Sequence, residues 1–357
     1  MLCRGLQRNN RQWMNKLYKT NKKEAVLRDD HNISKTAFLF ITQAAPKGAD
    51  LLGKSPLNYT GNKACIALYL LDIMPPHIGY IEAFCGSAEI LLWKEPCPRE
   101  ILNDYNSDLM NFWRVVRSDK LALLIGKIFL SVNGEEFFRE NRELLRGRPN
   151  VLDDYLDAAE HLRTATDEEV RAAVAFFETQ YYSFSSTGTS YGIRGKNILP
   201  KLKLMVTASQ RLQQAALLNR DYQAAIAQFA APGYLIFMDP PYVTTENFYE
   251  KSNFGRDSHV ELFRFVYEEI HVKYGGQCKV IITYNDCPLV RKQAEQYGFF
   301  VYTQDRLHNM AQHADPGSVF TEVIITNYDA LEVMNTKAFL RSREMDQLSL
   351  FPLGGDG

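Results

Sequence analysis

The chain has 357 residues, of which 46% are hydrophobic and 23% charged, as in folded soluble proteins and unlike disordered chains. Its 41 Lys and Arg residues nearly balance its 42 Asp and Glu residues, so the net charge of −1 excludes a uniformly basic nucleic-acid coat protein. The longest apolar run, Ala64–Leu71, is too short for a membrane helix, and the first residues lack the apolar core of a signal peptide. The six cysteines form no C-x-x-C pair, which predicts reduced thiols in a cytoplasmic protein and no zinc site.

The predicted elements alternate between helices and strands along most of the chain. A short apolar run at 37–42 predicts a strand or a buried turn, and the run 64–74 predicts a buried helix that ends at Pro75. Apolar runs of strand length occur at five further places: 80–84, 100–104, 234–238, 279–283 and 322–326. Strands separated by helices predict an α/β fold with a mainly parallel sheet.

The segments between these strands are predicted to be mainly helical. Helices are expected through 90–93, over 107–117 and over 202–218, and residues 118–180 form a charged and mostly helical region. A polar, glycine-containing loop covers 183–192. The helical middle of the chain therefore predicts a second domain inserted into the sheet domain.

Gly48–Ser55 matches the G-x-x-x-x-G-K-[ST] pattern of phosphate-binding loops. A working loop of this kind leaves a strand directly and opens a helix whose N-terminus binds phosphate. Here residues 43–47 separate the apolar run from Gly48, and Pro56 follows Ser55. We interpret the match as coincidental and keep a P-loop ATPase as an alternative function.

The tetrapeptide Asp239-Pro240-Pro241-Tyr242 directly follows the apolar strand 234–238. Ligands bind at the carboxyl ends of strands in open α/β sheets. The two prolines fix the backbone and remove two N–H donors, so the carbonyl groups there can act as acceptors. An acidic side chain beside fixed carbonyls suits the binding of an –NH2 group, and the tyrosine ring can stack on a flat base.

A glycine turn and a downstream acid form a second constellation. The strand 80–84 runs into Cys85-Gly86-Ser87, and the next strand ends in Asn103-Asp104. Such a turn, with an acid that binds a pair of sugar hydroxyls, grips adenosine-type cofactors in α/β folds. Upstream, residues 56–63 offer an aromatic ring and a cation before a predicted helix.

These segments, in this order, resemble the Dam-like class of N6-adenine DNA methyltransferases, which use S-adenosylmethionine. The resemblance covers 56–329 and is carried by five segments: Asn58–Lys63, Tyr80–Ser87, Asn103-Asp104, Asp221-Tyr222 and Asp239–Tyr242. It implies a Rossmann-like methyltransferase sheet with an inserted helical target-recognition domain.

The resemblance also implies roles for individual residues and a direct displacement that needs no metal. The implied cofactor-binding residues are Tyr59, Lys63, Phe84, Gly86, Ser87, Asp104 and Asp221. Asp239 and the Pro240 carbonyl would bind the target amino group, and Tyr242 would stack on an adenine flipped out of double-stranded DNA. Ala88 stands where the family usually has a second glycine, so we expect the loop to avoid a positive φ there.

The stretch Thr179–Arg220 has six basic residues and no acidic residue, which makes it the predicted DNA-contacting region. Its aromatic residues interleave with Ser, Thr, Gly and cations, as in loops that bind phosphates and insert wedges. The residues expected to contact DNA are Tyr191, Arg194, Lys196, Lys201 and Lys203. A non-enzymatic DNA-binding protein is an alternative, because it would contact DNA in the same way.

A cytosine methyltransferase is the closest enzymatic alternative. An N4-cytosine enzyme shares the fold, but Asp239 stands where a serine would be expected. A C5-cytosine enzyme would need a nucleophilic cysteine, usually in a Pro-Cys pair. We interpret the Pro96-Cys97 pair as a connection between a helix and a strand.

Four regions are predicted: a basic arm (1–55), a catalytic domain (56–117 with 218–329), a target-recognition insert (118–217) and a C-terminal tail (330–357). In the tail, Gln347–Phe351 resembles the peptide by which bacterial proteins bind the replication sliding clamp. The alternative is a tail that packs on its own body. The expected location is the cytoplasm, for a protein encoded by a bacterium or a phage.

Overall fold

The computed structural model describes residues 53–131, 134–152, 164–184, 188–192, 197–243, 254–307 and 319–349, together with Phe38. Side chains are described throughout these ranges except at 305–307, 319–320 and 342–349. Most of the predicted basic arm (1–55), including the apolar run 37–42 apart from Phe38, lies outside the described residues.

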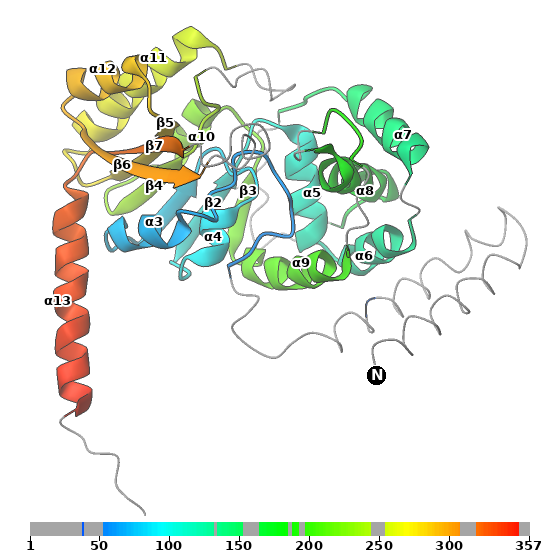
Figure 1. Cartoon of the computed structure of the whole chain (residues 1–357), viewed down its shortest axis with the longest axis horizontal. Helices are drawn as coiled ribbons and strands as arrows, with labels where there is room; N and C mark the ends of the chain where they lie inside the picture. Colours follow the sequence, from blue (N-terminus) through cyan, green and yellow to red (C-terminus); the bar gives the residue numbers. More distant parts are fainter. Residues whose placement is uncertain are drawn as a thin grey trace, which may run out of the picture.

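A seven-stranded sheet forms the centre of the molecule, with the strand order β3-β2-β1-β4-β5-β7-β6 (Figure 1). The strands are β1 (Gly79–Glu82), β2 (Arg99–Asn103), β3 (Ala215–Leu218), β4 (Tyr234–Met238), β5 (Lys279–Asn285), β6 (Phe300–Leu307) and β7 (Val319–Thr326). The first five strands of this order pair in parallel, and β7 runs antiparallel to both of its neighbours. The predicted mainly parallel α/β sheet is therefore confirmed. The strand order reverses at β1, so the crevice outside the carboxyl ends of β1 and β4 is where a ligand is expected.

Helices cover both faces of the sheet. The described helices are α3 (Ala67–Ile73), α4 (Glu89–Trp93), α5 (Ser107–Arg117), α6 (Leu121–Leu130), α7 (Glu135–Arg146), α8 (Asp167–Tyr182), α9 (Leu199–Leu212), α10 (Tyr222–Phe229), α11 (Arg256–Phe265), the π-helix η4 (Val266–Val272), α12 (Pro288–Gln296) and α13 (Ala330–Ser349). In Figure 1, α11 and α12 lie on one side of the sheet and α3 and α4 on the other.

Alternating side chains of the buried strands divide the interior into two cores. In β4, Leu235 and Phe237 point into the core that contains α3, α4, α5, α8 and α9. The neighbouring residues Ile236 and Met238 point into the core that contains α10, α11 and α12. All five residues of β4 are buried, as expected for a parallel strand that is covered on both faces.

Among the described residues between β2 and β3, the chain forms the five helices α5 to α9. Helix α8 packs against α5 and α7, and residues of α8 and α9 share one hydrophobic core with the sheet. Arg211 of α9 also binds Glu100 of β2 through two hydrogen bonds of 2.5 and 2.8 Å. The mostly helical character of 118–180 is thus confirmed for the part of this segment that the structure describes, whereas the division into a catalytic domain and an insert stays a prediction.

Two strands differ from the sequence-based expectation. The helix predicted over 202–218 ends at Leu212, and Ala215–Leu218 forms strand β3, which pairs with β2. Its Ala-Ala-Leu-Leu sequence favours a helix locally, and the pairing with β2 overrides that preference. Strand β6 was not expected either, because the polar residues of Phe300–Leu307 obscure the apolar pattern.

The backbone of the loop between β1 and α4 also differs from the sequence-based expectation. Ala88 adopts a left-handed conformation with φ +52°, contrary to the expectation that this position avoids positive φ. The turn requires this conformation, since the Ala88 N–H donates to the Cys85 carbonyl at 2.6 Å and the Ala88 carbonyl accepts from Leu92 at 3.1 Å. Because alanine has a Cβ atom, which glycine lacks, the left-handed conformation costs about 1–2 kcal/mol at this position.

We predict that Ala88→Val destabilises the protein by about 2–4 kcal/mol, because a β-branched residue is poorly tolerated in this conformation and the site is fully buried. Thermal unfolding should show a melting temperature lower by about 3–5 °C, given an unfolding entropy of about 2.1 cal/mol/K per residue. Ala88→Gly is the matched control, which relieves the backbone strain and should melt close to the wild type. A valine variant with wild-type melting would contradict the proposed strain.

No helix within the described ranges is long and apolar enough to cross a membrane. The five cysteines in those ranges are free thiols, and no group of His, Cys, Asp or Glu there is arranged to hold a metal ion.

Candidate active site

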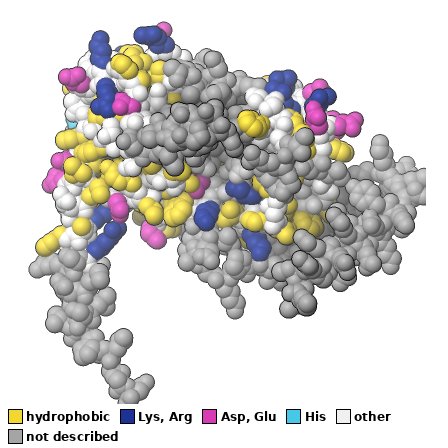
Figure 2. All heavy atoms as spheres, viewed as in Figure 1, with side chains coloured by type: hydrophobic (Ala, Val, Ile, Leu, Met, Phe, Trp, Pro, Cys, Tyr) yellow, Lys and Arg dark blue, Asp and Glu magenta, His cyan; other side chains and the backbone are white. Residues whose placement is uncertain are grey.

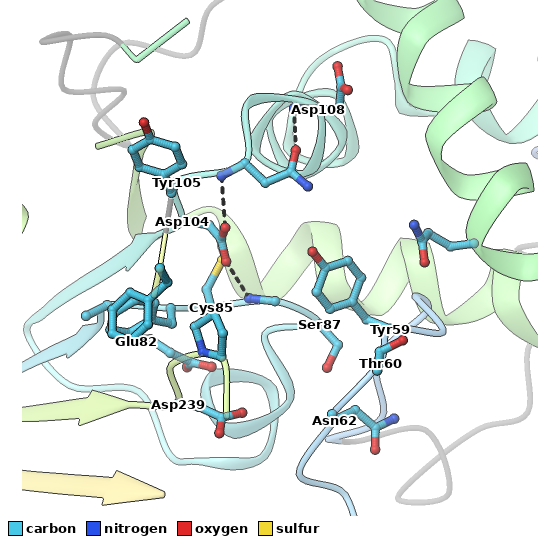
Figure 3. Close-up of a pocket in the computed structure, with 18 of the residues that line it drawn as sticks. Tyr59, Thr60, Asn62, Glu82, Cys85, Ser87, Asp104, Tyr105, Asp108 and Asp239 are labelled. Atoms are coloured by element: carbon cyan, nitrogen blue, oxygen red, sulfur yellow. Dashed lines mark hydrogen bonds between the residues drawn. The ribbon is translucent and has the colours of Figure 1, made fainter. Parts of the chain in front are cut away.

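A cavity of about 450 Å³ lies at the carboxyl edge of the sheet, a volume typical of small-molecule sites. It is lined by the loops that follow β1, β2, β3 and β4 and by the segment before α3 (Figure 3). All seven residues predicted to bind the cofactor line it: Tyr59, Lys63, Phe84, Gly86, Ser87, Asp104 and Asp221. Asp239 and Pro241 also line this cavity, so the structure brings the two predicted constellations together.

Asp104 connects the loops after β1 and β2. One carboxylate oxygen accepts from the Gly86 N–H and the other from the Asn106 N–H, both at 3.0 Å (Figure 3). The Gly86 carbonyl accepts from the Trp113 indole at 3.0 Å, which holds the turn from its other side. Burial raises the pKa of Asp104, while these backbone N–H groups oppose that rise. The acid is therefore fixed in place with lone pairs left for a pair of hydroxyl groups.

Aromatic side chains form another part of the wall. The Phe84 ring lies 5.1 Å from that of Tyr222 and 5.8 Å from that of Phe254. Asp221 caps α10 by accepting from the Gln223 N–H at 2.8 Å. A rigid apolar wall beside a carboxylate suits a flat heterocycle that carries an amino group. Phe254 was missed by the sequence analysis, since it belongs to none of the motifs.

Asp239 is held from two sides. Lys63 Nζ lies 2.6 Å from Asp239 Oδ2, and the Thr283 hydroxyl donates to Asp239 Oδ1 at 2.7 Å. Burial raises the pKa of Asp239, and Lys63 opposes this rise. Lys63 also donates to the Gly61 carbonyl at 2.7 Å. Lys63 therefore both forms an ion pair with Asp239 and lines the cavity.

Thr283 was also missed, although its position is readable in retrospect. Met238 pairs with Ile282 in the parallel register of β4 and β5, so the next residues, Asp239 and Thr283, are neighbours. Two apolar strands that end in Asp and Thr, if aligned, would have indicated this contact.

Tyr242 follows the two prolines and is half-buried. Its hydroxyl donates to Glu322 Oε1 at 2.5 Å, and Lys63 Nζ lies 5.0 Å from the centre of its ring. Neither Tyr242 nor Pro240 is among the residues that line the cavity, so they lie beside it, next to Asp239. Glu322 belongs to no motif, and sequence analysis gave no signal for its role.

Glu82 places a second carboxyl group at the end of β1, with only 2% of its surface exposed. Its Oε2 accepts from the Tyr80 hydroxyl at 2.9 Å and from the Leu91 N–H at 3.0 Å. Burial outweighs these donors and raises the pKa of Glu82 to about 8. Glu82 is therefore mainly protonated at neutral pH.

The predicted DNA-contacting region lies next to this cavity. The loop after α8 closes through hydrogen bonds from Phe184 to Ser190 and from Gly192 to Tyr182, both at 2.8 Å, and Gly188 of this loop lines the cavity. The Tyr191 ring packs 5.7 Å from Phe138, so it is partly used in packing. Arg194 and Lys196 lie outside the described residues.

Basic side chains gather over α9, as Figure 2 shows. Lys201 and Lys203 of this helix are half-buried, and Lys201 donates to the Ser55 carbonyl at 3.0 Å. Arg142 and Arg146 of α7 line the cavity and were missed, because they precede the acid-free stretch. These arginines add positive charge to the cavity wall.

Three further sequence features were singled out: the P-loop-like match, the Pro-Cys pair and the C-terminal peptide. No helix begins directly after Ser55, since the next helix along this described segment starts at Ala67. Pro96-Cys97 lies between α4 and β2, as expected for a connection. The backbone of Gln347–Ser349 ends α13, whereas the side chains of this peptide and all of Leu350 and Phe351 lie outside the described residues.

The strand order with its reversed β7 and the loops around the cavity define a Rossmann-like methyltransferase fold. Residues 59–310 match the family model described as D12 class N6 adenine-specific DNA methyltransferase. Because the match covers more than half of the chain, the protein belongs to this family. The resemblance seen in the sequence motifs is thus confirmed.

Individual relatives are similar at low identity. The chain is 25% identical over 299 residues to a type II methyltransferase of Lactococcus lactis subsp. cremoris, which covers 78% of this chain and 99% of that protein. It is 23% identical over 260 residues to the DNA adenine methylase of Serratia marcescens, covering 69% of this chain and 88% of that one. It is also 23% identical over 301 residues to Modification methylase StsI of Streptococcus sanguinis, where 80% of this chain spans only 44% of the relative.

Proposed function

We propose that the protein transfers a methyl group from S-adenosylmethionine to the N6 amino group of a specific adenine in double-stranded DNA. The observation that carries the proposal is the position of Asp239 in the wall of a cavity whose lining residues fit an adenosine-type cofactor. Family membership and the names of the relatives, a DNA adenine methylase and a type II methyltransferase, support the same reaction.

The residues around the cavity fit this cofactor. Asp104 would bind the ribose hydroxyls, and Asp221 and the Phe84 wall would hold the adenine ring. A side chain at Gly86 would approach the Tyr59 ring to 3.2 Å, so glycine keeps the turn open for the methionine end. When bound, S-adenosylmethionine supplies an electrophilic methyl group on a positively charged sulfur.

Asp239 and the Pro240 carbonyl would each accept a hydrogen bond from the target amino group. These bonds direct the nitrogen lone pair toward the cavity, and the new N–C bond forms as the C–S bond breaks. Positioning is the main contribution, for which effective molarities of about 10⁵–10⁸ M set the scale. The nitrogen then loses one proton, which a carboxylate with a raised pKa such as Asp239 is suited to accept.

The DNA contacts complete the proposal. The target adenine would leave the duplex at a cost of a few kcal/mol, and stacking on Tyr242 would return about 1–3 kcal/mol of this. We propose the region 118–217 as the target-recognition insert of a catalytic domain formed by 56–117 and 218–329. Its residues that would contact the duplex are Tyr191, Arg194, Lys196, Lys201 and Lys203.

The protein would act in the bacterial cytoplasm, as a modification enzyme or a phage enzyme. Its C-terminal peptide Gln347–Phe351 would bind the sliding clamp.

The decisive experiment is tritiated methyl transfer from S-adenosylmethionine to unmethylated DNA of mixed sequence, followed by mass analysis of the nucleosides. We expect N6-methyladenine as the labelled product. Methylated cytosine would instead indicate the N4 enzyme, and DNA binding without transfer would indicate a binding protein. Lys54→Ala should leave the rate within about twofold of the wild type, whereas loss of activity in this variant would support the P-loop alternative.

A further inference from the structure

Glu322 is a fully buried carboxylate beside the site, and no sequence motif includes it. It is located on β7, the strand that runs opposite to its neighbours, and its register partner on β5 is Asn285. The reversed direction brings the amino-terminal half of β7 to the sheet edge where β4 ends. Glu322 thereby reaches the Asp239–Tyr242 segment from the side opposite to the cofactor loops.

Two of the proposed functional groups meet at Glu322. Its Oε1 accepts the Tyr242 hydroxyl at 2.5 Å and lies 3.6 Å from Lys63 Nζ. Lys63, only 3% exposed, is in turn 2.6 Å from Asp239. Asp239, Lys63, Glu322 and Tyr242 therefore form a continuous chain of charged and hydrogen-bonded contacts within a buried region.

Lys63 occupies the Asp239 carboxylate that the target amino group needs, and Glu322 offers Lys63 a second partner. Lys63 lies against Asp239 Oδ2, on the same carboxylate that must accept a hydrogen bond from the target amino group. A buried ammonium cannot simply leave its carboxylate, because an unpaired buried charge is strongly unfavourable. A second carboxylate at 3.6 Å allows Lys63 to shift between two partners without losing its ion pair.

We propose that Glu322 is a positioning residue that accepts Lys63 when the target amino group binds Asp239 and that fixes the Tyr242 ring through its hydroxyl. This inference rests on the proposed adenine methylation. It assigns Glu322 an action through Lys63 and Tyr242, without direct contact with the cofactor or the base.

The test is Glu322→Gln in the full-length protein, with methyl transfer to unmethylated DNA measured across pH. Glutamine keeps the size and an acceptor for Tyr242 but removes the charge, so Lys63 stays on Asp239. We expect kcat to fall at least tenfold while the KM for S-adenosylmethionine stays within twofold. The charged groups that face Asp239 are Lys63 and Glu322, beside the mainly protonated Glu82, and loss of the Glu322 charge lowers the pKa of Asp239. The acid limb of the kcat profile should therefore move to lower pH.

Two further variants separate positioning from stability. Glu178→Gln replaces another buried glutamate, on α8, that does not line the cavity, and it should leave kcat and the acid limb unchanged. Glu322→Asp keeps the charge but withdraws from Tyr242, so kcat should fall while the acid limb stays at the wild-type pH. This variant also covers the case in which Glu322→Gln does not fold, as judged by its melting temperature.

Three results would overturn the inference: wild-type kcat in Glu322→Gln, a loss of kcat with an unchanged acid limb, or a shifted limb in Glu322→Asp. A wild-type protein that binds S-adenosylmethionine but methylates no adenine would instead refute the proposed function.

Discussion

Asp239→Ala is expected to reduce kcat for methyl transfer by about 10²–10³-fold, on the scale of removing a preorganised electrostatic partner from an active site. The variant loses the acceptor that orients the amino group and the carboxylate that can take its proton. Lys63 keeps Glu322 as a neighbour at 3.6 Å, so the buried cation is still paired and the protein should fold. Single-turnover transfer of a tritiated methyl group measures the effect on the chemical step.

Asp239→Asn is the matched control for this experiment. Asparagine keeps the shape and a carbonyl acceptor but loses the negative charge, so its rate should lie between those of Asp239→Ala and the wild type. Binding of S-adenosylmethionine, measured by calorimetry, should stay within about fivefold of the wild type in both variants, since the cofactor contacts proposed for Asp104 and Phe84 are unchanged. An alanine variant that retained more than a tenth of the wild-type rate would remove Asp239 from the mechanism.

The motifs were predictable because their chemistry depends on residues that are adjacent in sequence. Asp239 and Tyr242 lie within one tetrapeptide that follows an apolar strand, and Gly86 lies in a turn after another. The rule that ligands bind at the carboxyl ends of parallel strands then placed both at one edge of the sheet. Gly86 and Asp239 both line the cavity, with Tyr242 beside it, while the roles of these residues stay a prediction.

The residues that hold Asp239 were not predictable in the same way. Thr283 contacts Asp239 through strand register, and Glu322 contacts Lys63 and Tyr242 because β7 is reversed; a single sequence reveals neither the register nor the reversal. Lys63 was expected against the cofactor, and its ion pair with Asp239 depends on how the segment before α3 crosses the sheet edge. Strand β3 was missed for a related reason, because its pairing with β2 is a tertiary contact that local preference does not encode.

Glu82→Gln is expected to make the protein more stable than the wild type at alkaline pH. The pKa of Glu82 is raised from 4.5 to about 8 in the folded state, because burial disfavours its charged form. Between these two values the unfolded chain has released the proton while the folded protein still holds it. The free energy of unfolding therefore decreases as pH rises, with a slope of about 1.4 kcal/mol per pH unit from this group, and it levels off above pH 8.

Over the whole interval, Glu82 costs the folded wild type up to about 5 kcal/mol, which glutamine avoids because it does not titrate. Glutamine can still accept from the Tyr80 hydroxyl and the Leu91 N–H through its carbonyl oxygen. Urea unfolding at pH 5.5 and pH 8.5 compares the two proteins. The advantage of Glu82→Gln should grow by several kcal/mol between these pH values, and Glu100→Gln, which replaces a glutamate whose pKa is lowered mainly by hydrogen bonds from Arg211 and Lys94, should show no such growth. Equal pH dependence in the wild type and Glu82→Gln would mean that Glu82 is ionised in the folded protein, and that the Tyr80 and Leu91 donors outweigh the burial of its carboxylate.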